Sequence, residues 1–139
     1  MNSLLLLHVL SAVFLCGLIW VIQLVHYPSY HYVEEAKFID FEKFHMRRIS
    51  YLVMPAMLIE LSTAIYFCTQ FVDNWMWWLN LISILTIWLS TVFLSVPCHK
   101  ILSQRKDTKV INFLILSNWP RTLLWSTKLV LLWFIFKDY

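Results

Sequence analysis

Four long runs of hydrophobic residues, separated by shorter polar stretches, dominate the pattern along this chain. The runs cover about residues 4–26, 49–72, 75–97 and 119–136. Each has the roughly 18 to 24 residues that a helix needs to cross a hydrocarbon core of about 30 Å. Backbone groups inside a bilayer must find their hydrogen bonds within the helix, so the runs predict four transmembrane helices. We therefore expect an all-α, four-helix bundle that forms one integral membrane domain over residues 1–139.

The two longer connections between these runs each contain an amphipathic stretch. Residues 33–48 read VEEAKFIDFEKFHMRR. Their phenylalanines recur at helical spacing among charged residues, at positions Phe38, Phe41 and Phe44. In the other connection, polar SQRKDTK (103–109) leads into VINFLILSNWPRT. We interpret both stretches as short helices in the membrane interface, with Asn118 capping the last span and Pro120 in its first turn.

The composition supports a membrane protein. Hydrophobic residues make up 60% of the 139 residues and charged residues 14%, a balance that a soluble domain of this size cannot hide in one core. The first run lacks a basic leading region and a small-residue cleavage site, so we expect it to be retained rather than removed as a signal. The three cysteines are odd in number and far apart, which indicates neither a disulfide framework nor a Cys-x-x-Cys metal site.

Basic residues are distributed very unequally between the two sides of the predicted bundle. One side holds nine of them, Lys37, Lys43, Arg47, Arg48, Lys100, Arg105, Lys106, Lys109 and Arg121. The other side holds Lys137. Because basic residues stay on the cytoplasmic side, we expect both termini to be non-cytoplasmic. The basic rim suits anionic lipid headgroups, and nothing in the pattern indicates nucleic-acid binding.

Chain connectivity brings four of the five histidines to the cytoplasmic end of the bundle. The group comprises His26, His31, His45 and His99, together with Trp119 and Arg121. Neutral imidazoles gathered in this way could bind haem or a divalent metal ion. We take His26, His45 and His99 as the candidate ligands, and Trp119 and Trp125 as further cofactor-binding residues. No two of the histidines have metal-site spacing, so the alternative is that they only share the headgroup region with nearby tyrosines.

Two charged residues lie much deeper in the predicted spans. At 1.5 Å per residue, Glu60 lies about 17 Å and Lys128 about 13 Å from the cytoplasmic start of its span. A charge at such depth costs at least about 2.5–3.5 kcal/mol, so these residues normally face the bundle interior and pair. We predict an ion pair with Glu60 as general acid or base, and Arg121 as the residue that binds an anionic substrate group. The alternative is a purely structural salt bridge.

Further polar and aromatic residues recur at helical spacing around this pair. One stripe in the third span holds Ser83, Thr86 and Ser90, and one in the fourth holds Arg121, Trp125 and Lys128. Together with Gln23, one turn before His26, they outline a polar channel that opens at the histidine end. The tryptophans away from the interface are Trp20, Trp88 and Trp125. They are either core filler or walls for a planar ligand.

Three short motifs resemble those of the anthrone oxygenase-like family of small four-helix bacterial membrane proteins. HYP closes the first span, VPCHKIL closes the third and NWPRTLLW opens the fourth. The matching positions are His26, Pro28, Pro97, His99, Asn118 and Arg121, and His99 stands where many members carry asparagine. This resemblance implies a bundle in the bacterial cytoplasmic (inner) membrane that oxidises a flat aromatic substrate. GLIWVIQLVHYPSY bears a weaker likeness to the bacterial membrane protoporphyrinogen oxidase, a haem-binding helical bundle.

These observations predict a protein that holds a hydrophobic aromatic ligand, or a haem-like or metal cofactor, in the cytoplasmic half of its bundle. The expected chemistry is redox chemistry on a lipophilic substrate, as a membrane oxidoreductase or oxygenase. Two alternatives belong to other classes. One is a small proton-coupled transporter that uses Glu60 and works as a homo-oligomer, and the other is an accessory subunit of a larger membrane complex.

Overall fold

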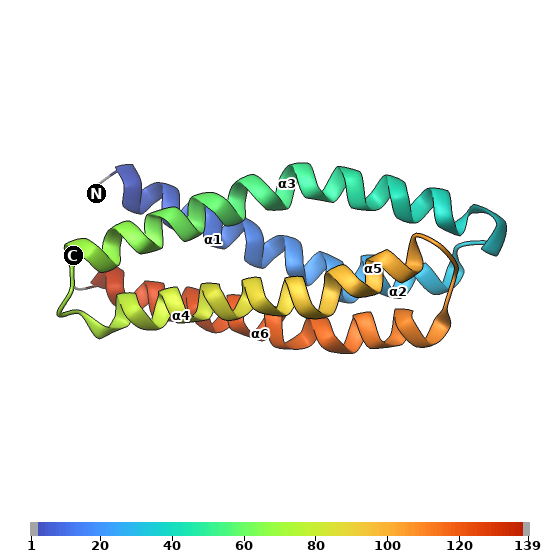
Figure 1. Ribbon diagram of the computed structural model, residues 1–139. Helices are drawn as coiled ribbons and strands as arrows, with labels where there is room; N and C mark the ends of the chain where they lie inside the picture. The colour runs from blue at the N-terminus through green and yellow to red at the C-terminus, as the bar shows by residue number, and fades with distance from the viewer. Residues whose placement is uncertain (1–2, 138–139) are drawn as a thin grey trace.

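The computed structural model describes residues 3–137, and these residues form helices with no strand among them. Four long helical units run side by side, and both ends of the chain lie at the same end of the bundle (Figure 1). The first unit joins α1 (Ser3–Val21), η1 (Ile22–His26), α2 (Tyr27–Ser29) and η2 (Tyr30–Tyr32). The second is α3 (Glu35–Gln70), and the third joins α4 (Trp75–Ser90), η3 (Thr91–Ser95) and α5 (Val96–Leu102). The fourth is α6 (Thr108–Lys137). The predicted all-α bundle is confirmed.

Two of the units contain a π-helical turn that ends two positions before a proline. The turn η1 precedes Pro28, and the turn η3 precedes Pro97. Proline has no backbone N–H and its ring clashes with the preceding turn, and a widened turn accommodates both effects without ending the helix. The third unit consequently continues past Pro97 to Leu102, beyond the end of its hydrophobic run.

The first amphipathic stretch is the beginning of a long helix and not a separate interfacial one. Helix α3 has 36 residues and is about 54 Å long, so it extends well past a hydrocarbon core of about 30 Å. Its first turns pack against the first helical unit, because Phe38 contacts Tyr30 edge-on, with ring centroids 5.7 Å apart. Glu42, one of the charged residues of the amphipathic stretch, is fully buried on this same face.

The second connection likewise runs directly into its helix. The prediction that Asn118 caps the last span is wrong, because α6 begins at Thr108 and passes through Pro120. Asp107 takes the capping role, since its Oδ1 accepts hydrogen bonds from the backbone N–H groups of Lys109 (3.0 Å) and Val110 (3.3 Å). The hydrogen bond from Val110 is the main reason that the pKa of the Asp107 carboxyl lies below its ordinary value.

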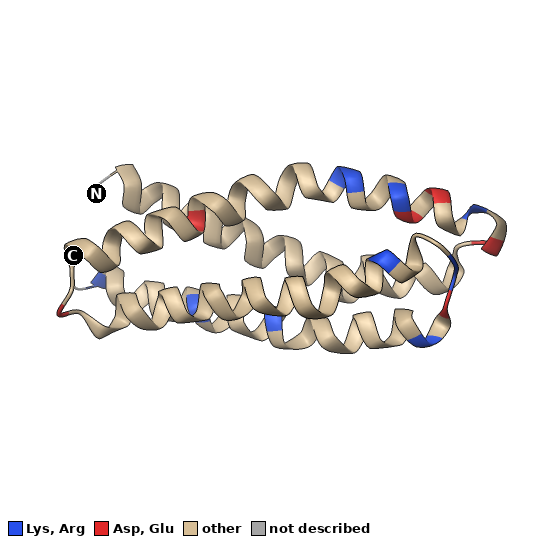
Figure 2. Cartoon of the chain, in the orientation of Figure 1, with Lys and Arg blue, Asp and Glu red and all other residues tan. Residues whose placement is uncertain are grey.

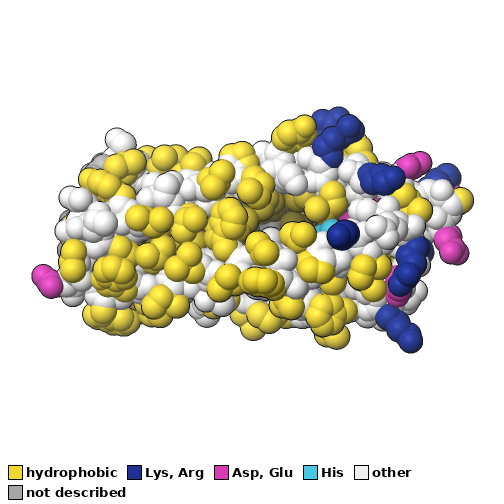
Figure 3. Space-filling view, viewed as in Figure 1, with side chains coloured by type: hydrophobic (Ala, Val, Ile, Leu, Met, Phe, Trp, Pro, Cys, Tyr) yellow, Lys and Arg dark blue, Asp and Glu magenta, His cyan; other side chains and the backbone are white. Residues whose placement is uncertain are grey.

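The outside of the bundle has the character of a membrane protein. Within residues 3–137, three helical stretches are long and apolar enough to cross a membrane, namely Ser3–Tyr32, Glu35–Gln70 and Trp75–Leu102. Hydrophobic side chains are spread over the face seen in Figure 3, while most charged side chains gather toward one end. That end holds the α2–α3 and α5–α6 connections and lies opposite the termini (Figure 2).

Inside the bundle, α1 and α4 both pack against α3 and against α6. Near the termini, aromatic stacking fills the interior, with the ring centroids of Phe67 and Trp77 4.4 Å apart. Toward the charged end, α3 and the η3–α5 segment are less closely packed, and a cavity lies between them.

Candidate functional site

A cavity of about 330 Å³ lies in the half of the bundle nearer the charged end, and all four helical units line it. Its walls are mostly apolar and include Leu15, Ile19, Val53, Met57 and Trp88. The surface is hollowed on the face shown in Figure 3, next to a histidine and beside Lys and Arg side chains. The volume falls in the range of small-molecule sites, about 300–1,000 Å³.

The polar end of the cavity is formed by Arg121, which is 4% exposed. Its guanidinium donates to Asn118 Oδ1 and, over 3.2 Å, to Thr91 Oγ1, and it neighbours the Tyr27 hydroxyl. Asn118 in turn donates to Gln23 Oε1 over 2.8 Å. All of these partners are neutral. Among the described residues, Arg121 has no carboxylate partner, and its Nε atom has no hydrogen-bond partner.

A second polar chain reaches the same end of the cavity from α3. The Nδ1 atom of His99 lies 2.6 Å from Glu42 Oε1, and its Nε2 atom lies 3.1 Å from the Tyr27 hydroxyl. Glu42, Tyr27 and His99 are all buried, and the last two line the cavity. Sequence reasoning missed Glu42 and Tyr27. The spacing of Phe38, Glu42 and His45 on one helix face was a signal that could have placed Glu42 inside.

The three histidines proposed as metal ligands come together, but they do not form a metal site. His26 and His45 stack with ring centroids 4.1 Å apart, and His99 directs both ring nitrogens to Glu42 and Tyr27. In the described part of the chain, no group of three or more His, Cys, Asp or Glu side chains is arranged to hold a metal ion. His26 also does not line the cavity. Among the described residues, these three histidines therefore show no three-ligand metal arrangement. His31, expected in the same group, is exposed.

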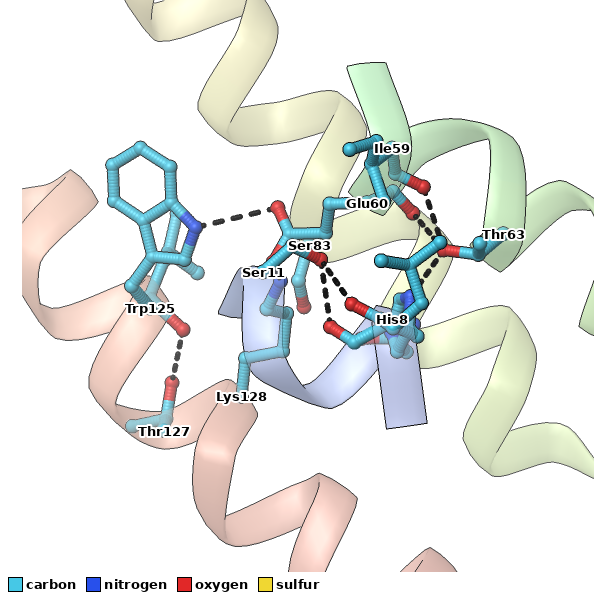
Figure 4. Close-up of polar contacts among 12 residues, drawn as sticks. His8, Ser11, Ile59, Glu60, Thr63, Ser83, Trp125, Thr127 and Lys128 are labelled. Carbon is cyan, nitrogen blue, oxygen red and sulfur yellow. Dashed lines mark hydrogen bonds and ion pairs between the residues drawn. The ribbon is translucent and has the colours of Figure 1, made fainter. Parts of the chain in front are cut away.

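The predicted Glu60–Lys128 ion pair is confirmed. Lys128 Nζ donates to Glu60 Oε1, and both side chains are buried. The Trp125 indole donates to Glu60 Oε2 over 3.4 Å, and Figure 4 shows it directed toward the carboxylate. Trp125 lines the cavity, whereas Glu60 and Lys128 do not. The indole therefore separates the ion pair from the cavity, which argues against direct contact between Glu60 and a ligand there.

A further buried polar group lies beside the ion pair and was missed by sequence reasoning. His8 Nδ1 is 2.7 Å from Thr63 Oγ1, and His8 Nε2 is 3.1 Å from Asn80 Nδ2 (Figure 4 shows the first contact). These hydrogen bonds link the three helices α1, α3 and α4. Polar residues join helices inside a bilayer in this way. A histidine and an asparagine within long apolar runs were the available signal.

Two other predicted features lie elsewhere. Trp119 is 37% exposed and packs against Trp20, so it is not part of the cavity lining. The interior stripe of the third unit consists of Asn80, Ile84, Ile87, Thr91 and Ser95. The predicted stripe is displaced from it by one position, which is about 100° around a helix. Thr86 is consequently exposed, and its hydroxyl bonds to the backbone of Ile82.

The site thus combines apolar walls, one buried cation and a hydrogen-bonded chain of Tyr27, His99 and Glu42. No family model, curated protein or solved structure matches this chain. Its chemistry follows from the side chains themselves. They are suited to hold a lipophilic molecule that has an anionic or hydrogen-bonding group at one end.

Proposed function

We propose that this protein takes a lipophilic, flat ligand from the bilayer into its cavity and holds an anionic group of that ligand at Arg121. The observation that carries the proposal is the environment of Arg121. Its charge is buried at the end of an apolar cavity, and no carboxylate partner is present among residues 3–137. A buried charge without a counter-charge costs several kcal/mol, and a bound anion would remove that cost.

The other deeply buried cation of this bundle makes the contrast clear. Lys128 has Glu60 as its counter-charge and lies outside the cavity lining. Arg121 has only neutral partners and lies inside it. A guanidinium presents several N–H donors in one plane, which matches the two oxygens of a carboxylate or the oxygen of a phenolate.

The route into the cavity is consistent with a ligand dissolved in lipid. Among the lining residues, Met54 of α3 and Val92 and Val96 of the η3–α5 segment are more than two-fifths exposed on the outside of the bundle. These side chains are apolar, so the entrance between them faces acyl chains better than water. Aromatic walls such as Trp88 and Trp125 suit a planar ligand body. Oxidation of that ligand stays a prediction from the family resemblance.

Binding of a pyrene-labelled carboxylate tests this proposal. We expect energy transfer from the protein's tryptophans to the pyrene in nanodiscs, with tighter binding of the carboxylate than of its methyl ester. Arg121→Gln should weaken carboxylate binding by about tenfold or more, because a buried charge pair is lost. Arg105→Gln, which changes an exposed arginine, is the matched control and should bind as the unaltered protein does. Equal affinities for carboxylate and ester would contradict the role of Arg121.

We also propose that the bundle crosses a bacterial cytoplasmic membrane four times with both termini non-cytoplasmic. Three stretches have the necessary length and apolar character, and α6, with 30 residues, lies alongside them. The two cations in the middle of α6, Arg121 and Lys128, are buried in the bundle and not exposed to lipid. The basic end supports a cytoplasmic location for the two longer connections.

Reporter fusions give a direct test of this orientation. A reporter that is active only in the periplasm should be active when fused after Tyr139 and silent when fused after Lys106, because the basic connections stay in the cytoplasm. A reporter that is active only in the cytoplasm, fused at the same two points, is the control and should give the opposite pattern. Activity of the periplasmic reporter at Lys106 would reverse the proposed orientation.

A further inference from the structure

The Tyr27 hydroxyl occupies the junction between the buried cation and a histidine–carboxylate pair. It neighbours the Arg121 guanidinium on one side and lies 3.1 Å from His99 Nε2 on the other. His99 Nδ1 in turn lies 2.6 Å from Glu42 Oε1. Four helical units supply the four residues, since Tyr27 is in α2, Glu42 in α3, His99 in α5 and Arg121 in α6. Packing of the whole bundle therefore builds this chain.

The direction of the hydrogen bonds follows from the donors and acceptors. An ionised Glu42 only accepts, so the proton between it and His99 belongs to Nδ1. The other ring nitrogen, Nε2, is then an acceptor, and the Tyr27 hydroxyl donates to it. The phenolic oxygen retains lone pairs on the side of Arg121. In this arrangement, each proton along the chain already points from the cavity toward Glu42.

We propose that Tyr27, His99 and Glu42 accept the proton of a weakly acidic hydroxyl group on the ligand that Arg121 binds. The ligand O–H bond breaks and its proton bonds to the Tyr27 oxygen, while the proton of Tyr27 moves to His99 Nε2. The ligand becomes an oxyanion opposite Arg121, and His99 becomes an imidazolium opposite Glu42. Net charge is conserved, and no oxidant or reductant takes part. This inference rests on the proposed function, and it names the ligand as a lipophilic phenol or a similarly acidic hydroxyl compound.

The surroundings favour two separated ion pairs over two neutral groups. Glu42 is fully buried, and the imidazolium that forms would be its counter-charge at hydrogen-bond distance. Arg121 likewise gains the counter-charge that it lacks. The other titratable groups that face this chain are His26 and Tyr30 from the first unit, His45 from α3 and Cys98 from α5. None of them is a carboxylate. Glu42 is therefore the carboxylate that would pair with the imidazolium of His99.

A nitrophenol that carries an alkyl chain makes the proton transfer visible, because its phenolate absorbs at longer wavelength than the phenol. We expect the probe bound in nanodiscs to remain phenolate at a pH at least one unit below its midpoint in protein-free nanodiscs. One unit corresponds to a tenfold change in the ionisation equilibrium. Quenching of the tryptophan fluorescence by the probe measures binding, and the absorbance of the probe measures its ionisation. Both are recorded on the same sample.

Three variants assign this effect to the chain. His99→Gln and Tyr27→Phe each interrupt it and should raise the ionisation midpoint of the bound probe by at least one pH unit, while Arg121 still holds the probe. Both are tested because either one alone could disturb folding. His45→Gln is the matched control, since His45 also lines the cavity but has no hydrogen bond to Glu42 or Tyr27 among those described. It should shift the midpoint by less than either of the other two variants.

The outcomes separate this inference from the proposed function. Absence of probe binding to the unaltered protein overturns both. Binding with an unchanged midpoint in His99→Gln and Tyr27→Phe overturns the proton-accepting chain and leaves the anion site standing. An equal shift in His45→Gln also overturns it, because the effect would then come from polarity of the cavity wall. Retained binding with a larger shift in the first two variants than in His45→Gln supports it.

Discussion

Glu60→Gln and Lys128→Met, each made alone, are expected to lower the free energy of unfolding by about 3–5 kcal/mol. Each substitution leaves one buried charge without its partner in the middle of the bundle. The double variant should recover most of the loss, because no unpaired charge remains. Titration of the purified protein with a denaturing detergent, followed by circular dichroism, measures the four unfolding free energies that the cycle needs.

An exposed ion pair at the start of the helix that holds Glu60 serves as the control. Lys37 and Glu34 lie 2.8 Å apart, but both side chains are at least 70% exposed. Glu34→Gln and Lys37→Met should therefore change stability little, alone or together. Additive losses in the Glu60–Lys128 cycle would contradict the coupling. They would indicate that each residue stabilises the bundle through its other contacts, such as the hydrogen bond between Trp125 and Glu60.

Filling the cavity should abolish ligand binding while leaving the bundle folded. Val53 lies on the α3 wall of the cavity and is half-buried. A tryptophan at this position would place its indole in the open volume of about 330 Å³, where it can pack without displacing the core. We expect Val53→Trp to weaken binding of the pyrene carboxylate at least tenfold, a change of about 1.4 kcal/mol, with no loss of thermal stability.

The neighbouring residue offers a matched control for this variant. Leu52 is 53% exposed on the outside of α3, so Leu52→Trp adds the same side chain to the same helix on the face toward lipid. Ligand affinity should be unchanged in this variant. Full binding by a folded Val53→Trp protein would show that the ligand occupies another site, and the assignment of Arg121 would then also fail.

The Glu60–Lys128 pair was predictable because its cause is local to each helix. Depth in a span follows from residue number at 1.5 Å per residue, and a charge at that depth requires a partner in the interior. Two such residues of opposite charge at similar depth are therefore expected to pair with each other. The same argument could have predicted that His8 faces the bundle interior, since it is a polar residue within an apolar run.

The chain of Tyr27, His99 and Glu42 was not predictable in this way. Glu42 lies between charged residues, and a helix that begins with solvated charges is the common arrangement for such a stretch. Its burial is stabilised by His99, which is 57 residues further along the chain. A sequence pattern does not show which residues far apart in the chain come into contact. The pairing of Glu42 with His99 is therefore seen only in the packed bundle.

The sequence by itself determined that the chain forms apolar helices, which end carries the basic residues and which deep charges must pair. These properties depend on the hydrophobicity, charge and depth of individual residues. Only the tertiary structure decided which faces meet. Tyr27 and His99 follow the π-helical turns η1 and η3, which change the register of their helices, and the two side chains lie 3.1 Å apart in the packed bundle. The cavity arises between packed helices, and its volume depends on how four surfaces fit together, which no single stretch of sequence contains.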